Sequence, residues 1–188
     1  MNFGKVAAGE KLHDLDPFER LRLCFEDIAT HHSDADLCVL TGDLSEAGQT
    51  EAYVLLKQLL VDLPKRASLL LGNHDHRQRF CDVFTHTPKD SNGFIQWAEP
   101  TPEGVMLFLD TNALGTDEGV YCQQRHQWLR EQLAQHHDFP IYLFMHHPPF
   151  DIGIPNMDAQ RLRDCDTFAQ TLAGHNDIRH QFFRPTRH

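Results

Sequence analysis

Short apolar runs alternate along this chain with longer segments in which apolar residues recur every three or four positions. The short runs predict strands, because a buried strand needs only a few consecutive apolar residues. These strands are expected at residues 37–40, 68–71, 94–97, 105–109, 141–145 and 178–183. The recurring apolar positions predict helices, which are expected from Asp16 onward and over residues 49–63, 123–136 and 158–172.

The order of these elements indicates the fold class. Strands that alternate with helices favour an α/β fold with a largely parallel sheet. The 188 residues suit one domain with a core of its own, since domains of about 100–200 residues are common. No internal repeat, low-complexity segment or linker divides the sequence. Residues 1–188 are therefore predicted to form a single domain.

Composition excludes some classes of function. The net charge is -10 with neutral histidines, which disfavours a nucleic-acid polymer as partner, because such partners are held by clustered Lys and Arg. Small phosphate esters remain possible substrates, since a bound metal ion can supply positive charge. No apolar stretch approaches the roughly 20 residues of a membrane span, and the beginning of the sequence lacks the apolar run of a signal peptide.

The cysteines indicate the compartment. There are five, an odd number, and no two are spaced as a CxxC pair. Reduced, mostly buried thiols in a cytoplasmic protein are therefore expected. Homo-oligomerisation stays open at this stage.

Polar residues of the kind that bind metals follow three of the predicted strands. Asp43 comes after the first, Asn73-His74-Asp75 after the second, and His146-His147 after the strand at residues 141–145. In α/β sheets, functional sites form where the carboxyl ends of strands meet. Three such strand ends in one chain predict one convergent site.

These motifs resemble those of the calcineurin-like metallophosphoesterases. The resemblance rests on Gly42-Asp43 with Gly48, on Gly72-Asn73-His74-Asp75, and on His146-His147. Met145-His146-His147-Pro148-Pro149-Phe150, with Gly153 and Met157-Asp158, is similar to the cyclic-nucleotide and glycerophosphodiester phosphodiesterase branch, as is Gly9-Glu10-Lys11-Leu12. The resemblance implies a layered α-β-β-α sandwich and covers nearly the whole chain.

The same resemblance implies roles for the site residues. Asp43 would bridge two divalent ions (Mn, Fe, Co or Zn), and Asn73 and His146 would bind the second of them. His74 would lie beside the phosphate, where it stabilises charge or protonates the leaving oxygen. Asp75 and His147 would orient their neighbours or contact the substrate. The implied reaction is attack on a small phosphodiester by metal-bound hydroxide.

Two motifs of the family are not found in this sequence. An Asp-x-His after a first strand and a Gly-His-x-His near the last strand are both missing, and Arg184-Pro185 follows Phe183 where the second motif is expected. The fold is therefore expected to be incomplete at both ends and to retain only part of the metal-ligand set. A truncation or deletion, residues missing from the recorded sequence, and a degenerate family member all remain open as explanations.

Two alternatives to a phosphodiesterase also remain open. The chain could be a catalytically impaired remnant of the fold that binds metal or phosphate, which the missing ligands favour. It could also be a phosphomonoesterase or protein phosphatase of the same superfamily, which hydrolysis of mono- and diester substrates would distinguish.

Overall fold

The structure is a computed structural model, and it describes residues 16–183. The chain divides into two compact units, one up to Thr87 and one from Pro88. Each unit is described by itself, so a single domain over residues 1–188 stays a prediction. The resemblance motif at Gly9–Leu12 and the junction at Arg184-Pro185 lie outside the described residues.

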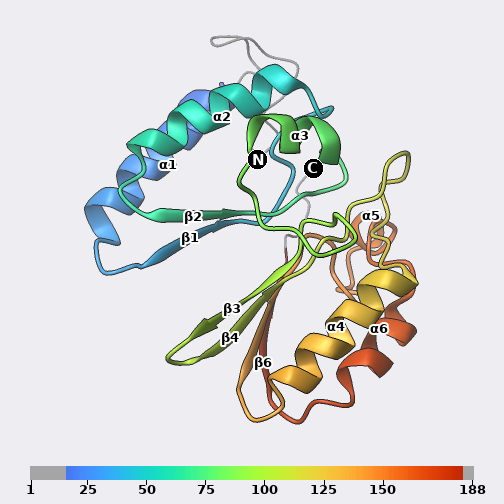
Figure 1. Ribbon diagram of the computed structural model, residues 1–188. Coiled ribbons are helices and arrows are strands. Elements are labelled where there is room, and N and C mark those ends of the chain that lie inside the picture. Colours follow the sequence, from blue (N-terminus) through green and yellow to red (C-terminus); the bar gives the residue numbers. More distant parts are fainter. Residues whose placement is uncertain (1–15, 184–188) are drawn as a thin grey trace. The chain divides into compact units, whose positions relative to one another are not determined.

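Over residues 16–87 the first unit contains two parallel strands and three helices (Figure 1). In chain order they are α1 (Pro17–His31), β1 (Leu37–Leu40), α2 (Thr50–Asp62), β2 (Arg66–Leu69) and α3 (Arg77–Val83). The strands pair from Leu37↔Arg66 to Leu40↔Leu69. Because α2 connects two parallel neighbours, both strands end at the same edge of the pair, and the loops that follow them leave from there.

The sequence explains where the first helix begins. Asp16 caps α1, and its side chain accepts hydrogen bonds from the backbone N–H groups of Phe18 and Glu19 at 2.9 and 3.1 Å. Pro17 occupies the first helical turn, where its missing N–H costs nothing. The apolar stripe of α1 then buries Leu21 and Phe25.

The core of the first unit forms around α2. That helix buries Tyr53, Leu56 and Leu59, and the ring of Tyr53 meets the edge of Phe80 from α3 at 5.5 Å between centroids. The segment directly after β2 adds the fully buried Leu70 and Leu71. This packing fixes the loops that follow β1 and β2.

The second unit contains a four-stranded sheet in the order β3-β4-β5-β6. Its strands are β3 (Trp97–Thr101), β4 (Gly104–Phe108), β5 (Ile141–Phe144) and β6 (Ile178–Phe182), and its helices are α4 (Gln123–Gln135), α5 (Pro155–Asp158) and α6 (Cys165–Leu172). The β3–β4 pair is an antiparallel hairpin, whereas β4, β5 and β6 are mutually parallel. The ends of β4 and β5 therefore lie at one edge of this sheet.

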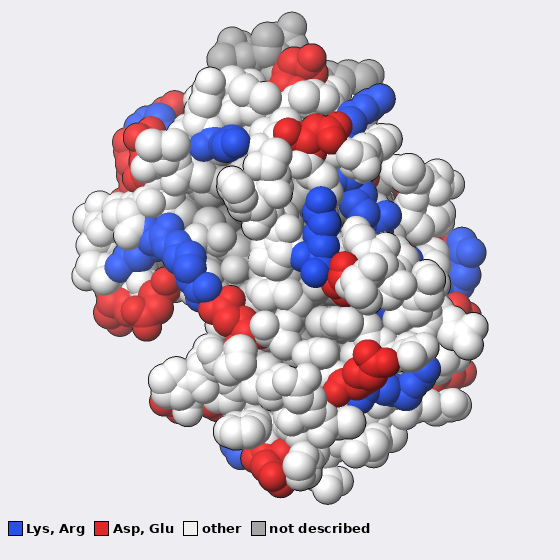
Figure 2. Space-filling model, viewed as in Figure 1, with Lys and Arg blue, Asp and Glu red and all other residues white. Residues whose placement is uncertain are grey.

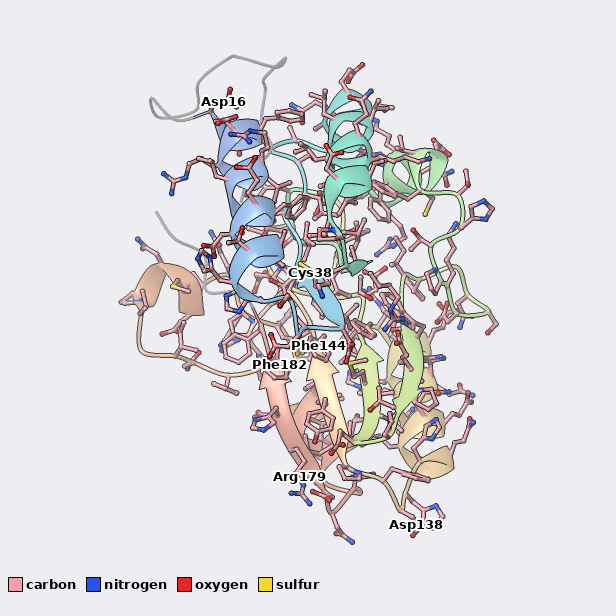
Figure 3. All side chains as sticks on the ribbon, turned by 90° about the vertical axis from the view of Figure 1, so that its left-hand side faces the viewer. Asp16, Cys38, Asp138, Phe144, Arg179 and Phe182 are labelled. Carbon is pink, nitrogen blue, oxygen red and sulfur yellow. The ribbon has the colours of Figure 1, made fainter. Side chains whose placement is uncertain are left out.

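The two faces of this sheet carry different side chains. One face packs against α4 and α6 through a cluster that includes Leu107, Leu143, Leu129 and Phe168. The opposite face carries a ladder of stacked rings, one from each strand: Trp97, Phe108, Phe144 and Phe182. Figure 3 labels Phe144 and Phe182 near the ends of β5 and β6. Residues that face the helices alternate along each strand with residues on the opposite face, which is the period-two pattern of a strand.

The fold confirms the predicted α/β class with its parallel strands and corrects several boundaries. The single helix predicted at 158–172 is wrong, because α5 ends at Asp158 and α6 begins only at Cys165. The strand predicted at 94–97 begins instead at Trp97, and β2 ends two residues earlier than predicted. The seven-residue helix α3 was not predicted. The α-β-β-α layering of the two units stays a prediction.

Both signs of charge are present on the drawn surface. On the face shown in Figure 2, acidic side chains lie among the basic ones. Within residues 16–183 no helix is both long and apolar enough to cross a membrane. The five cysteines are free, as predicted, but half-buried rather than mostly buried.

Candidate functional site

The loop after β1 holds Asp43 in an unusual backbone conformation. Asp43 has a φ of 54° and is the only described residue other than glycine with a positive φ. Its side chain is 2% exposed. A left-handed conformation costs most residues about 1–2 kcal/mol, although aspartate tolerates it better than most. Strain of this kind persists where surrounding contacts enforce it, and it is common at functional sites.

Asp75, in the loop after β2, binds the two residues that follow Asp43. Its carboxylate accepts hydrogen bonds from the backbone N–H groups of Leu44 and Ser45 at 3.0 Å each and of Gly72 at 2.8 Å. It also accepts one from the Tyr53 hydroxyl at 3.1 Å. Asp75 therefore joins the two loops to each other and to α2, and its role beside a metal ligand stays a prediction.

The charge of Asp75 is costly to bury. Burial raises the pKa of this carboxyl to about 6, while the N–H groups of Gly72 and Leu44 lower it and the nearby carboxylate of Asp43 raises it further. The hydrogen bonds offset part of the desolvation.

Because Asp75 joins the two loops, His74 lies next to Asp43. Its backbone N–H donates to Asp43 Oδ1 at 3.4 Å, and its ring Nδ1 lies 2.7 Å from the backbone carbonyl of Glu46. Since a carbonyl only accepts, Nδ1 carries a proton and donates it. Nε2 is the ring nitrogen that this contact does not engage. Asn73, the preceding residue, is half-buried in the same loop.

In the second unit, His146 and His147 follow β5 and are each 2% exposed. Their rings meet edge to face at 4.8 Å between centroids. Nδ1 of His147 lies 2.7 Å from the hydroxyl of Thr111, which comes from the loop after β4. Burial holds the pKa of His147 well below its usual value, and the neighbouring His146 adds to this effect. His147 is therefore neutral and held in one orientation.

Gly119 packs directly on the ring of His147. A Cβ at this position would lie 2.6–2.8 Å from Cγ, Cβ and Nδ1 of the histidine. We expect Gly119→Ala to displace the ring, break its contact with Thr111 and destabilise the second unit by about 1–3 kcal/mol. Urea unfolding followed by circular dichroism measures this change.

Gly174→Ala is the matched control, because a Cβ there has no atom within 4 Å. It should change the free energy of unfolding by less than about 0.5 kcal/mol. Equal stability of both variants would contradict the close packing of Gly119 on His147.

The structure thus brings Asp43, Asn73, His74 and Asp75 together in the first unit, and His146 and His147 in the second. The convergence of the two groups stays a prediction. Among residues 16–183 no three His, Cys, Asp or Glu side chains form a group that could hold a metal ion. A carboxylate, an amide oxygen and an imidazole are suitable ligands for a divalent metal, but the described donors within either unit alone are too few to enclose one.

A family model described as calcineurin-like phosphoesterase matches residues 12–180. The chain belongs to this family. The match includes the loops of Asp43, Asp75 and His146.

Relatives within the calcineurin-like phosphoesterases are named as phosphodiesterases. A probable cyclic nucleotide phosphodiesterase of Rhodopseudomonas palustris is 37% identical over 89% of this chain and 62% of its own length. A probable glycerophosphodiester phosphodiesterase of Arcobacter nitrofigilis is 32% identical over 68% of this chain and 47% of its own length. The chain therefore matches about half to three fifths of each of these two relatives.

A solved structure supports the fold assignment to calcineurin-like phosphoesterases. A dimetal phosphatase from Danio rerio superposes with a TM-score of 0.66 over 86% of this chain and 69% of its own. At 13% sequence identity, this similarity concerns the fold alone.

One buried polar cluster of this calcineurin-like phosphoesterase was not predicted from the sequence. Asp110, Thr111 and Asn112 follow β4 and are almost fully buried. The Asp110 carboxylate accepts from the N–H groups of Ile95 at 2.9 Å and Asn112 at 3.0 Å, and Arg125 donates to the backbone carbonyl of Asp110 at 2.6 Å. The missed signal was a fourth apolar strand that ends in polar residues, the same pattern as at Asp43, Asn73 and His146.

Proposed function

We propose that this protein is a metal-dependent phosphodiesterase that hydrolyses cyclic nucleotides or glycerophosphodiesters. The proposal rests on the hydrogen bonds of the Asp75 carboxylate, which join the loops after β1 and β2. Asp43 and His74 lie next to each other in these loops. Two relatives of this chain are named for these two kinds of diester, a probable cyclic nucleotide phosphodiesterase and a probable glycerophosphodiester phosphodiesterase. Small phosphodiesters, rather than nucleic-acid polymers, are the proposed partners, and the cytoplasm is the proposed location.

Asp43, Asn73 and His146 are the residues that would hold two divalent ions, with Mn, Fe, Co and Zn as candidates. When bound, such ions offset charge on the phosphoryl group and make water more acidic. Asp43 is suited to bridging because its carboxylate offers two oxygens. His146 would supply a nitrogen donor from the end of β5. Asp75 and His147 would keep these donors oriented.

His74 is the proposed catalytic group. Its Nδ1 proton is engaged by the Glu46 carbonyl, so Nε2 is the nitrogen that can exchange a proton with the substrate. A protonated ring would donate from Nε2 to the leaving oxygen or offset charge on the phosphoryl group. The carbonyl of Glu46 fixes the ring for this purpose.

The first test is hydrolysis of bis(4-nitrophenyl) phosphate by the purified chain, with added Mn²⁺ and with a chelator. We expect turnover that requires metal and that exceeds the rate on 4-nitrophenyl phosphate by about tenfold or more, equivalent to about 1.4 kcal/mol in the barrier. A faster reaction with the monoester would favour the phosphomonoesterase alternative. A folded chain of 21.7 kDa without turnover would favour the impaired remnant.

A comparison of two natural substrates distinguishes cyclic nucleotides from glycerophosphodiesters as the substrate class. Adenosine 3′,5′-cyclic monophosphate and glycerophosphoethanolamine, supplied at equal concentration, would be compared by release of phosphomonoester product. The substrate that is hydrolysed faster identifies the substrate class. If neither is hydrolysed, the proposed substrates are wrong, although turnover of the nitrophenyl diester would still establish phosphodiesterase activity.

A further inference from the structure

Arg125 is a buried charge in the first turn of α4. Its side chain is only 4% exposed, and arginine is almost never buried to this extent unless it is paired. An apolar side chain could fill a place in the core without the cost of taking a charge out of water. Packing alone therefore does not explain an arginine at this position, and its polar partners have to be considered.

The partners of Arg125 lie in the segment that follows β4. Its Nη1 donates to the backbone carbonyl of Asp110 at 2.6 Å and to that of Asn112 at 3.2 Å. The same nitrogen lies 3.7 Å from Oδ1 of the Asp110 carboxylate, and the guanidinium carbon lies 4.5 Å from the centroid of the Phe94 ring. Asp110 and Asn112 flank Thr111, so the guanidinium holds this segment on both sides of the threonine.

Other hydrogen bonds fix the same segment. The Asp110 carboxylate accepts from the N–H of Asn112 at 3.0 Å, and the N–H of Val120 donates to the carbonyl of Thr111 at 3.0 Å. Thr111 itself is fully buried. The backbone around Thr111 is therefore held by several partners, and with it the direction in which the threonine side chain leaves the chain.

Thr111 connects this segment to His147. Its hydroxyl lies 2.7 Å from Nδ1 of the histidine ring, because β4 and β5 are parallel neighbours and the segments that follow them leave from the same edge of the sheet. Gly119, the residue before Val120, packs on the same histidine side chain. Two contacts of His147 therefore come from residues whose placement depends on the segment that Arg125 binds.

We propose that Arg125 is a positioning residue for the phosphodiesterase site. It holds residues 110–112 in the conformation that directs the Thr111 hydroxyl to His147, and it thereby sets the orientation of the histidine pair that follows β5. Lysine cannot replace it, since an ammonium group lacks the planar fork of donors and the stacking on an aromatic ring. The effect on turnover rests on the proposed function, whereas the effect on His147 is confined to the second unit and does not.

The first test follows the His147 ring in the metal-free chain. With ¹⁵N-labelled histidine, long-range ¹H–¹⁵N spectra report which ring nitrogen carries the proton, and the His147 signals are assigned by their loss in His147→Gln. We expect two well-separated ring-nitrogen signals in the wild type, because a fixed partner at Nδ1 selects one tautomer. In Arg125→Lys and in Arg125→Gln they should move toward each other, as the released ring samples both tautomers. Unchanged signals in folded Arg125 variants would overturn the proposal.

Leu133→Ala is the matched control for a loss of stability alone. Leu133 is a buried core residue that lies about two turns further along α4, so its replacement weakens the same helix without removing a partner of residues 110–112. The His147 signals of this variant should equal those of the wild type. If they changed as much as in Arg125→Lys, general destabilisation would account for the effect, and the positioning role would be wrong.

The second test uses bis(4-nitrophenyl) phosphate and added Mn²⁺. Arg125→Lys should lower kcat about tenfold and change KM by less than about twofold, because a displaced histidine pair impairs the reaction more than binding. Thr111→Val should have the same effect, and Arg125→Lys should cause no further loss in that variant, since the arginine acts through the hydroxyl. Losses that multiply would overturn the proposal. A wild type without turnover would refute the proposed function, and the histidine spectra would still decide the role of Arg125.

Discussion

Replacing Asp43 by asparagine is expected to lower metal-dependent hydrolysis of bis(4-nitrophenyl) phosphate by about a thousandfold or more. The proposed bridging role needs a charged carboxylate, and its loss would remove several kcal/mol of stabilisation from the transition state. Asparagine keeps the shape of the side chain and tolerates the positive φ of 54° at this position. The free energy of unfolding should therefore change by less than about 1 kcal/mol. Asp43→Ala should abolish activity as well.

Asp82→Asn is the matched control, because Asp82 is an exposed carboxylate on α3 of the same unit. Its activity should equal that of the wild type. Mn²⁺ binding, followed by electron paramagnetic resonance, provides a second readout and should weaken about tenfold or more in Asp43→Asn. Retained turnover and unchanged binding in this variant would refute the assignment of Asp43 as a metal ligand.

Replacing Asp75 by alanine is expected to destabilise the first unit by about 3–5 kcal/mol. The variant leaves three buried backbone N–H groups and the Tyr53 hydroxyl without their acceptor, and each unsatisfied buried donor costs about 1–3 kcal/mol. The expected loss of stability is smaller than the sum of these four costs, because water can enter the space left by the carboxylate. Urea unfolding followed by far-ultraviolet circular dichroism gives the free energy.

Amide hydrogen exchange locates the effect of Asp75→Ala. Protection should fall first at Leu44, Ser45 and Gly72, the three residues whose N–H groups lose their partner. Asp82→Ala should leave both protection and the free energy of unfolding within about 0.5 kcal/mol of the wild type. If Asp75→Ala were equally stable, the two loops would have to be held by other contacts.

Helices and strands were predictable where the residues of the element itself indicate it. Asp16 and Pro17 mark the start of α1, and apolar runs mark β1, β4 and β5. The segment at 158–172 was mispredicted because tertiary hydrogen bonds interrupt it: Arg163 N–H donates to the Gly119 carbonyl at 2.8 Å, and Leu162 N–H to that of Pro148 at 2.9 Å. Such partners are distant in sequence, and local periodicity gives no sign of them.

The boundary of β3 was mispredicted for a related reason. The N–H of Ile95 is bound by the Asp110 carboxylate, and the N–H of Gln96 by the carbonyl of Phe94. These residues form a turn instead of pairing with β4, so the strand begins only at Trp97. The short helix α3 buries a single side chain, Phe80, which is too little to produce a helical pattern.

The residues of the candidate site could be named from the sequence, but the contacts that hold them could not. The motif at Asn73–Asp75 indicated metal-ligand residues, whereas two of the four hydrogen bonds of Asp75, those from Leu44 and Ser45, come from a loop that is 31 and 30 residues away in sequence. The pairing of Thr111 with His147 also depends on two neighbouring strands. Motifs identify the chemical groups, and the sheet register decides which groups meet.

The distribution of tryptophan gives the two units separate spectroscopic signals. The chain contains two tryptophans: Trp97 stacks on Phe108 at 4.2 Å, and Trp128 packs against the core between the sheet and α4. Both belong to the second unit, so fluorescence excited selectively at tryptophan reports on that unit, whereas the helical ellipticity sums over both. Coincident fluorescence and ellipticity transitions would make the chain one cooperative unit, and staggered transitions would make it two.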